Sequence, residues 1–470
     1  MRNRSSIQTS KNIKADSTAY LTSGNLNKIF VQYLIPAVTA TLLIAVTYII
    51  DTICVGQKFG ESGLAALNVV VPVTGFLYAL GYMFAYGGSI QYAADLGRNE
   101  PDKAKQAFTG SFVTLAVLCG LIMALGLIFL DPITEFLCAG GSMVQMTREY
   151  MQFVFWFAPF YCMEIYFSVF TRNDDKPRLS MIGTMCCSTL NIILDVLFIY
   201  GFNWGMAGAS LATGIALVVA TLVEMSAMFY KTSCMRFVRV YGYLKQVRSY
   251  VRVGAPTFLR ELATALVTLI INIILLRLSG EIAVAAYGIV ANLATVVLFG
   301  LAGVSNGMQP LVSINAGAGR LDRVKKLLRK ALIVSAVMAM VYIAFAEFFP
   351  QILTAVFVDS KDPSFLAMSR DGIRFVSPSY LLAGLTIVLN VYCESVQANN
   401  EALLLSLLRG IVLPITCVFG CAALWGVNGV WFSFLSTEMI SFVVAILIIV
   451  RVSRGLRQYR YIQPVESWKE

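Results

Sequence analysis

The sequence predicts an all-α polytopic membrane protein with twelve transmembrane helices, arranged as two six-helix lobes related by a pseudo-twofold axis along the membrane normal. Two observations lead to this prediction: a very high apolar content and a repeat of about 220 residues. Of the 470 residues, 58% are hydrophobic and only 13% are charged, and the mean hydropathy is +0.74. At about 20 to 25 residues per crossing, that apolar content is enough for roughly ten to thirteen helices.

Runs of residues without charge predict the individual spans. The first two cover 29–50 and 62–94. The same criterion gives ten more spans, at 108–130, 150–171, 179–200, 207–229, 253–276, 283–313, 331–349, 375–396, 402–423 and 427–450. The chain is accordingly expected to divide into an N-terminal tail (1–27), a first lobe (28–230), a basic linker (231–252), a second lobe (253–450) and a C-terminal tail (451–470).

Basic residues in the loops predict the orientation. The loops on the side of the termini hold 28 Lys and Arg residues, whereas those on the opposite side hold 6. By the positive-inside rule, both termini of this multi-pass protein are expected in the cytoplasm, with the helices in the cytoplasmic (inner) cell membrane. The net charge of +10 is thereby explained by topology, so no nucleic-acid partner is expected.

Several classes of function are excluded by residues that the chain lacks. It has no histidine, which rules out His-based metal sites, triads and proton shuttles. The 316–320 stretch lacks the Gly-Lys-Ser/Thr ending of a phosphate loop. We therefore expect no enzyme activity, no cofactor and no ATPase subunit, with transport driven by an ion gradient.

The internal repeat aligns landmarks of the two halves at a shift of about 220 residues. Gly and Pro positions match, including Pro36 with Pro256, and so does a charged loop, in which Asp102-Lys103-x-Lys105 aligns with Asp322-Arg323-x-Lys325. Shared packing needs would explain the Gly and Pro residues but not this loop. Six helices per half give both halves the same orientation, with a cavity between the lobes that suits alternating access.

Polar residues within the apolar runs predict an ion-coupling site in the first lobe. Asp51 ends the first run, Asn191 and Asp195 share one face of the fifth span, and Thr213 lies early in the sixth. Their oxygens would hold a sodium ion, or the two carboxyl groups would share a proton. The alternative is structural: both aspartates bond to helix ends near the outer interface, and Asn191 joins helices.

Five further polar residues are candidates for lining the substrate cavity: Glu164, Glu261, Gln309, Asn390 and Glu394. An acidic group in the membrane suits a cationic ligand, and placing a charge there costs ~2.5 to 3.5 kcal/mol. The structural alternative is that Glu261 pairs with its neighbour Arg260 and that Glu394 lies at the interface.

Several motifs resemble the multidrug and toxic compound extrusion (MATE) transporters, from about residue 20 to 450. They include Tyr48-Ile-Ile-Asp51-Thr-x-x-Val-Gly56, Asn191-Ile-Ile-Leu-Asp195 and Gly205-Met-Ala-Gly208, and Ser406-Leu-Leu-Arg409 is similar to the small bacterial drug-exporting branch. The resemblance implies a V-shaped pair of lobes and rocker-switch exchange. It also implies a sodium or proton site at Asp51, Asn191, Asp195 and Thr213.

The function expected from these observations is secondary active efflux of organic cations and other amphipathic drugs in exchange for Na⁺ or H⁺. The protein is expected to act as a monomer, with Pro36 as the hinge of the first span. The alternative is a lipid-linked oligosaccharide flippase of related architecture, which would use a cationic cavity. Arg260 and Arg409 favour that alternative, while the acidic group around Asp51 argues against it.

Overall fold

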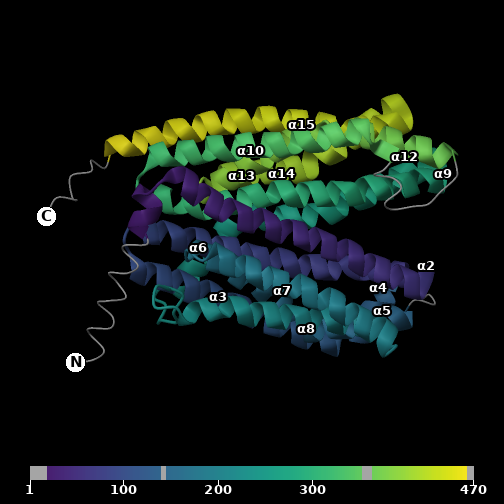
Figure 1. Cartoon of the computed structure of the whole chain (residues 1–470), viewed down its shortest axis with the longest axis horizontal. Coiled ribbons are helices and arrows are strands. Elements are labelled where there is room, and N and C mark those ends of the chain that lie inside the picture. Colours follow the sequence, from purple (N-terminus) through teal and green to yellow (C-terminus); the bar gives the residue numbers. More distant parts are fainter. Residues whose placement is uncertain (1–17, 139–143, 352–362, 463–470) are drawn as a thin grey trace.

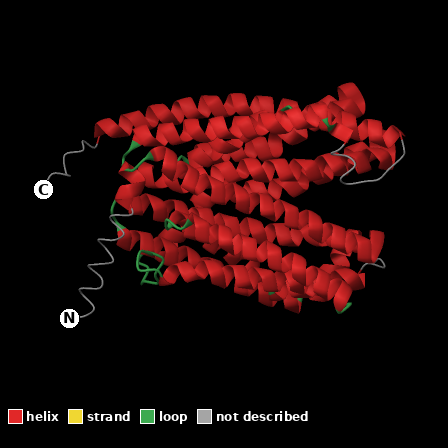
Figure 2. Cartoon of the chain, viewed as in Figure 1, coloured by secondary structure: helices red, strands yellow, loops and turns green. Residues whose placement is uncertain are grey.

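The computed structural model describes residues 18–138, 144–351 and 363–462. Every regular element in these residues is helical, as Figure 2 shows. A short helix at 18–23 precedes α2. The other elements are α2 (Leu26–Gly97), α3 (Pro101–Ile128), α4 (Leu130–Cys138), α5 (Val144–Trp156), α6 (Ala158–Asn173), α7 (Pro177–Asp195), η1 (Val196–Gly201), α8 (Gly205–Met225), η2 (Ser226–Phe229), α9 (Tyr243–Gly317), α10 (Leu321–Phe348), α12 (Pro363–Val376), α13 (Ser379–Ser395), α14 (Asn399–Leu407), η3 (Leu408–Val412) and α15 (Leu413–Ile462).

The described residues contain nine helices long and apolar enough to cross a membrane, and eleven spans when two bent pairs are counted as one span each. The pairs are α5 with α6, bent by 51°, and α12 with α13, bent by 44°. One of the nine, Asn399–Arg454, contains 56 residues and is interrupted at the non-helical Gly426. Division at this glycine gives twelve spans, in agreement with the predicted fold class.

The spans form two lobes that lie side by side (Figure 1). Helices α2 to α8 make up the first lobe and α9 to α15 the second. The core of the first lobe is rich in aromatic side chains, with Phe108, Tyr166 and Phe170 packed together. The start of α2 belongs to the other lobe in packing terms, because Ile29 and Tyr33 are buried in a cluster with residues of α9 and α10.

The backbone repeats the duplication seen in the sequence. Residues with positive φ recur at matching places in the two halves, in the pairs Gly60 and Gly280, Asn99 and Gly319, Asp175 and Gln397, and Gly205 and Gly426. A positive φ is uncommon for residues other than glycine. Its recurrence at Asn99, Asp175 and Gln397 therefore shows that both lobes have the same helix breaks and the same loops.

The two lobes are in close contact near the end of the molecule that holds residues 97–101 and 317–321, here called the terminal face. There, a Cβ atom added to Gly97 would overlap the carbonyl oxygen of Ile314, and one added to Gly317 would overlap that of Ala94. Toward the opposite end, the distal face, Gly75 and Gly288 have no neighbouring atom within 4 Å of such a Cβ. Figure 1 shows α2 diverging from the second lobe in this direction, so the lobes are joined at the terminal face.

Some helix boundaries differ from those expected. Residues 243–252, expected in the linker, form the first turns of α9, which begins after Gly242 in a left-handed conformation (φ 65°). The fourth span is broken between Trp156 and Ala158. Its second part has proline near its start, where the missing N–H of proline is tolerated. Uncharged runs predict that a span exists, but they do not predict its bends.

Candidate ion-coupling site

The carboxyl groups of Asp51, on α2, and Asp195, at the end of α7, lie close enough to interact electrostatically. Asp195 is fully buried. Within the described residues, no donor reaches Oδ1 of Asp51 or either carboxyl oxygen of Asp195. Two carboxylates close together in the interior of a membrane protein repel each other, which favours a shared proton or a bound cation.

Asn191 and Thr213 complete the group that was predicted from the sequence. Asn191 lies one turn before Asp195 on α7 and is buried. Its Nδ2 donates to Oγ1 of Thr213 on α8 (3.1 Å), and this hydroxyl donates to the carbonyl of Ala209 (3.2 Å). The amide oxygen of Asn191 and the carboxylate of Asp195 share one helix face, which provides oxygens of the kind that a sodium ion prefers.

A π-helical segment, η1, follows Asp195 directly. In it, the Tyr200 hydroxyl donates to the carbonyl of Cys54 (3.0 Å), which ties this segment to α2 less than one turn beyond Asp51. Such segments widen the helix locally and are frequent at functional sites. Here the contact fixes α2 against α7 at the two carboxyl groups.

Two tyrosines that the sequence analysis did not single out lie near these carboxyl groups. Tyr150 on α5 and Tyr161 on α6 are buried and close enough to interact electrostatically with Asp51 and Asp195. The Tyr161 hydroxyl has no hydrogen-bond partner among the described residues. The Tyr161 hydroxyl could therefore donate a hydrogen bond to the carboxylate of Asp51 or Asp195 if that side chain moved toward it.

The two acidic candidates of the second lobe differ from the pair in the first lobe, because Glu261 and Glu394 both face Arg260. Nη1 of Arg260 lies 3.3 Å from Oε1 of the buried Glu394, and its Nε lies 3.6 Å from Oε1 of Glu261. Thr257 donates to the second oxygen of Glu394 (3.2 Å). Arg260 thus neutralises this group, and it joins α9 to α13.

The three remaining cavity candidates lie in three different places. Gln309 is buried in the contact between the lobes, where it bonds to Asn173. Asn390 is buried within the second lobe, and its Nδ2 donates to the Ser406 hydroxyl (2.8 Å). Glu164 is buried in α6. The five candidates therefore do not form one cluster, and their role in binding substrate stays a prediction.

Glu164 belongs to a buried charged group that the sequence analysis missed. It interacts electrostatically with Glu224 on α8 and with Arg172 on its own helix. Neither carboxyl oxygen of Glu224 has a hydrogen-bond partner among the described residues that meets normal geometry. Glu224 sits against Gly183 of α7, where a Cβ would overlap its side chain. The sequence did contain a signal for this group, because Glu224 is an acidic residue within the sixth predicted span.

Pro36 lies inside α2, and Pro256 lies at the matching place in α9. The segment around Pro36 packs tightly on α9, since a Cβ on Gly303 or Gly307 would meet the backbone of Val38 or Leu34. A proline inside a helix removes one backbone hydrogen bond and permits a bend. This bend would lie between the joined terminal face and Asp51.

The fold and the site define a class: a multi-pass membrane protein built from two copies of a six-helix unit, with an acidic pair inside the first copy. A family model described as MatE matches residues 36–197 and 256–419, one match in each half. The chain belongs to the MatE family.

Known relatives align with this chain over nearly its whole length. The chain is 26% identical over 445 residues to the multidrug export protein MepA of Staphylococcus saprophyticus, covering 93% of this chain and 96% of that one. It is 27% identical over 443 residues to MepA of Staphylococcus aureus, with the same coverage. A solved structure described as the outward-facing conformation of a multidrug resistance MATE family transporter matches with a TM-score of 0.87 at 20% identity, covering 93% of this chain and 98% of that one. This structural match supports the two-lobe fold.

Proposed function

We propose that the protein exports cationic or amphipathic small molecules in exchange for Na⁺ or H⁺, by alternating access between its two lobes. The observation that carries this proposal is the proximity of Asp51 to Asp195, for which no arginine or lysine partner is found among the described residues. In the second lobe, by contrast, Arg260 faces both Glu261 and Glu394. An acidic pair within the membrane that lacks a basic partner is suited to take up an exchangeable cation.

The orientation follows from the loop charges. The terminal face carries the excess of Lys and Arg, so it is assigned to the cytoplasm together with both termini. The close contact of the lobes then lies on the cytoplasmic side, and their separation lies toward the outside. In this conformation, the ion site at Asp51 is loaded from outside, and a bend of α2 at Pro36 releases the exported molecule.

The driving force limits the stoichiometry. Exchange of one proton for one monovalent cation moves no net charge, so the membrane potential contributes nothing. A gradient of one pH unit then supplies about 1.4 kcal/mol, which supports roughly tenfold accumulation. Steeper export of a cation requires more than one coupling ion per cycle.

The arginines that favoured a flippase are both engaged with acidic side chains. Arg260 faces Glu394, and Arg409 makes two hydrogen bonds to Glu438 (3.1 and 2.8 Å). Neither therefore provides the free positive charge that a lipid-linked glycan phosphate would need. The names of the relatives also favour drug export, since the two staphylococcal proteins are multidrug export proteins.

The test is efflux of a fluorescent cationic dye from proteoliposomes under an imposed sodium gradient and, separately, a proton gradient. We expect one gradient to drive efflux in the wild type, and Asp51→Asn or Asp195→Asn to abolish it. Asp102→Asn is the matched control, because Asp102 is exposed at the surface, where it pairs with Lys105. Undiminished gradient-driven efflux by both site variants would refute the assigned coupling site. Efflux of lipid-linked glycans but not dyes would refute drug export itself.

A further inference from the structure

The first turns of α10 at the terminal face are strongly basic. Residues 320–330 hold one acid, Asp322, and six basic residues: Arg320, Arg323, Lys325, Lys326, Arg329 and Lys330. No ion pair is found for Arg320 or Lys326 within the described parts of the chain, and both side chains are exposed. So many like charges in eleven residues repel one another, and an anion would relieve that repulsion.

The first lobe provides an internal comparison. The matching residues 100–110 hold two acids and two bases, and these neutralise one another. Lys103 pairs with Glu100 (2.9 Å), and Lys105 pairs with Asp102 (2.8 Å). Both loops lie at the same face of the membrane, so orientation alone does not account for the excess in the second lobe. The difference indicates a role specific to α10.

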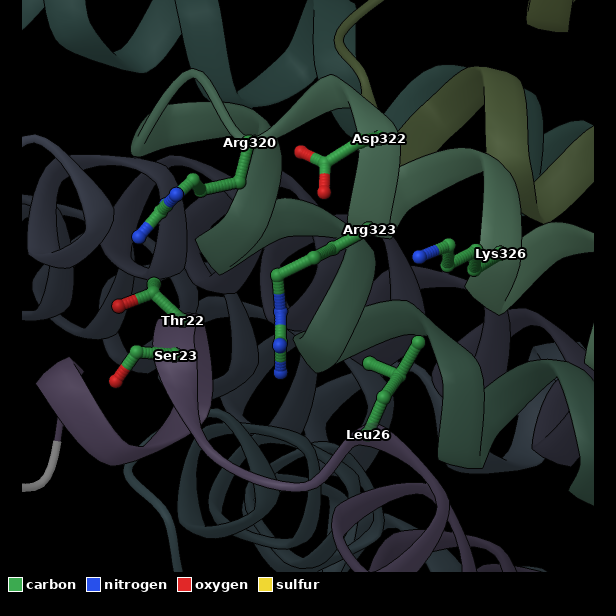
Figure 3. A pocket seen from close by; sticks show the side chains of 7 residues that line it. All are labelled: Thr22, Ser23, Leu26, Arg320, Asp322, Arg323 and Lys326. Atoms are coloured by element: carbon green, nitrogen blue, oxygen red, sulfur yellow. The ribbon is translucent and has the colours of Figure 1, made fainter.

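Three of these basic residues, Arg320, Arg323 and Lys326, line a pocket of about 200 Å³ between the N-terminal helix and α10. Figure 3 shows the guanidinium groups of Arg320 and Arg323 directed toward the side of the pocket that holds the hydroxyls of Thr22 and Ser23. The Leu26 side chain lies below them. The pocket therefore offers cationic groups and hydroxyls over an apolar base, which suits a phosphate group attached to an apolar chain.

The Arg323 side chain holds the segment before α2 in place through hydrogen bonds. Its Nη1 donates to the carbonyl of Gly24 (3.0 Å), and its Nη2 donates to that of Leu21 (3.1 Å). Its Nε donates to Oδ1 of Asn315 on α9 (3.1 Å). Arg323 thus holds the segment before α2 on the second lobe, while Arg320 and Lys326 remain available for a ligand.

A second pocket adjoins the first and extends along α10 toward the membrane. It shares Leu26 and Lys326 with the first pocket and adds Arg329, Lys330 and Ile333. Beyond it, the same helix exposes apolar side chains at helical spacing: Ile333, Val337, Met340 and Val341 are 53%, 50%, 52% and 66% exposed. An apolar face of this kind on a membrane span contacts lipid chains.

We propose that these two pockets bind the phosphate headgroup of an anionic phospholipid, whose acyl chains lie along Ile333, Val337 and Val341 of α10. Basic pockets beside transmembrane helices bind anionic lipid headgroups when they lie at headgroup depth. The continuity of the charged and apolar surfaces favours a lipid over a soluble phosphate. The bound lipid bridges the N-terminal helix and α10, and so holds the start of α2 on the second lobe.

The experiment measures binding of phosphatidylglycerol to the full chain in phosphatidylcholine nanodiscs, with the change in thermal unfolding midpoint as the readout. The variant is Arg320→Gln with Lys326→Gln, and the matched control is Lys103→Gln with Lys105→Gln in the first lobe. Removing two charges should weaken phosphatidylglycerol binding roughly 30-fold. The control should bind as the wild type does. Soluble glycerol phosphate at the same concentration should leave the midpoint unchanged.

Three outcomes would overturn the proposal. Equal weakening in the variant and the control would mean that phosphatidylglycerol responds only to overall charge. Unchanged binding in the variant would remove the pocket from consideration. An equal response to glycerol phosphate would assign the pocket to a soluble anion. Arg329→Gln with Lys330→Gln tests the second pocket independently, and the same roughly 30-fold loss is expected there.

Discussion

Asn173 and Gln309 exchange two amide hydrogen bonds across the contact between the lobes. Nδ2 of Asn173 donates to Oε1 of Gln309 (3.0 Å), and Nε2 of Gln309 donates to Oδ1 of Asn173 (3.2 Å). Both side chains are buried. This reciprocal pair joins α6 to α9 across the contact between the lobes, so a separation of the lobes at the terminal face would break both bonds.

The first prediction concerns this pair. Asn173→Ala or Gln309→Ala leaves the oxygen of the other buried amide without its partner from the opposite lobe, and each is expected to lower the free energy of unfolding by about 1 to 3 kcal/mol. The double variant removes both amides and is expected to lose less than the sum of the single losses, by about 1 kcal/mol or more. A thermal unfolding cycle on the four proteins measures this coupling. Strictly additive losses would show that the two amides do not act together.

The pair also illustrates what the sequence could and could not predict. Asn191 and Asp195 are predicted to act together because they are four residues apart on one helix. Thr213 is predicted to join them because a short turn connects its helix to theirs. Asn173 lies 136 residues from Gln309, and no local periodicity connects them. The proximity of Tyr161 to Asp51 likewise depends on the rotation of α6 against α2, which hydropathy does not determine.

The repeat was a stronger guide to the fold than to the chemistry. It correctly related Gly60 to Gly280 and Gly205 to Gly426, whose backbones share a positive φ. It also related Asp51 to Ile271, which is buried in an apolar cluster of the second lobe. Backbone breaks are shared because both lobes need the same helix packing. The charged residues are not needed for that packing, so the repeat does not carry them from one lobe to the other.

The second prediction concerns the acidic pair. Asp51→Asn removes one of two neighbouring carboxyl groups that repel each other, so it is expected to raise the free energy of unfolding by about 1 kcal/mol while it abolishes gradient-driven efflux. Thermal unfolding in sodium-free buffer at pH 8 measures the first effect. Loss of stability together with loss of efflux would mean instead that Asp51 supports the fold through contacts other than Asp195.

The third prediction concerns Arg409 and Glu438, a doubly hydrogen-bonded ion pair that is mostly buried between η3 and α15. Arg409→Ala leaves the carboxylate of Glu438 uncompensated, and the expected loss of stability is about 3 to 5 kcal/mol. Combining Arg409→Met with Glu438→Leu should restore most of it, since both charges are removed together. A double variant as unstable as Arg409→Ala would show that the pair is needed for more than charge compensation.

The fourth prediction concerns the glycines at the joined face. An alanine at Gly97 or Gly317 places a Cβ against the backbone of the other lobe, at Ile314 or Ala94. Since backbone cannot move aside as a side chain can, Gly97→Ala and Gly317→Ala are expected to separate the lobes at the terminal face. Hydrogen–deuterium exchange of the segments 83–97 and 307–317 should become faster in both variants.

The control for this prediction is Gly120→Ala in α3, where no atom lies within 4 Å of the added Cβ. Alanine is the better helix former, so this variant should gain up to about 1 kcal/mol in stability. Exchange at the terminal face should remain as in the wild type. Unchanged exchange in Gly97→Ala and Gly317→Ala as well would show that the lobes absorb the added methyl group without separating. In that case the close approach at Ile314 and Ala94 would not be what keeps the terminal face shut.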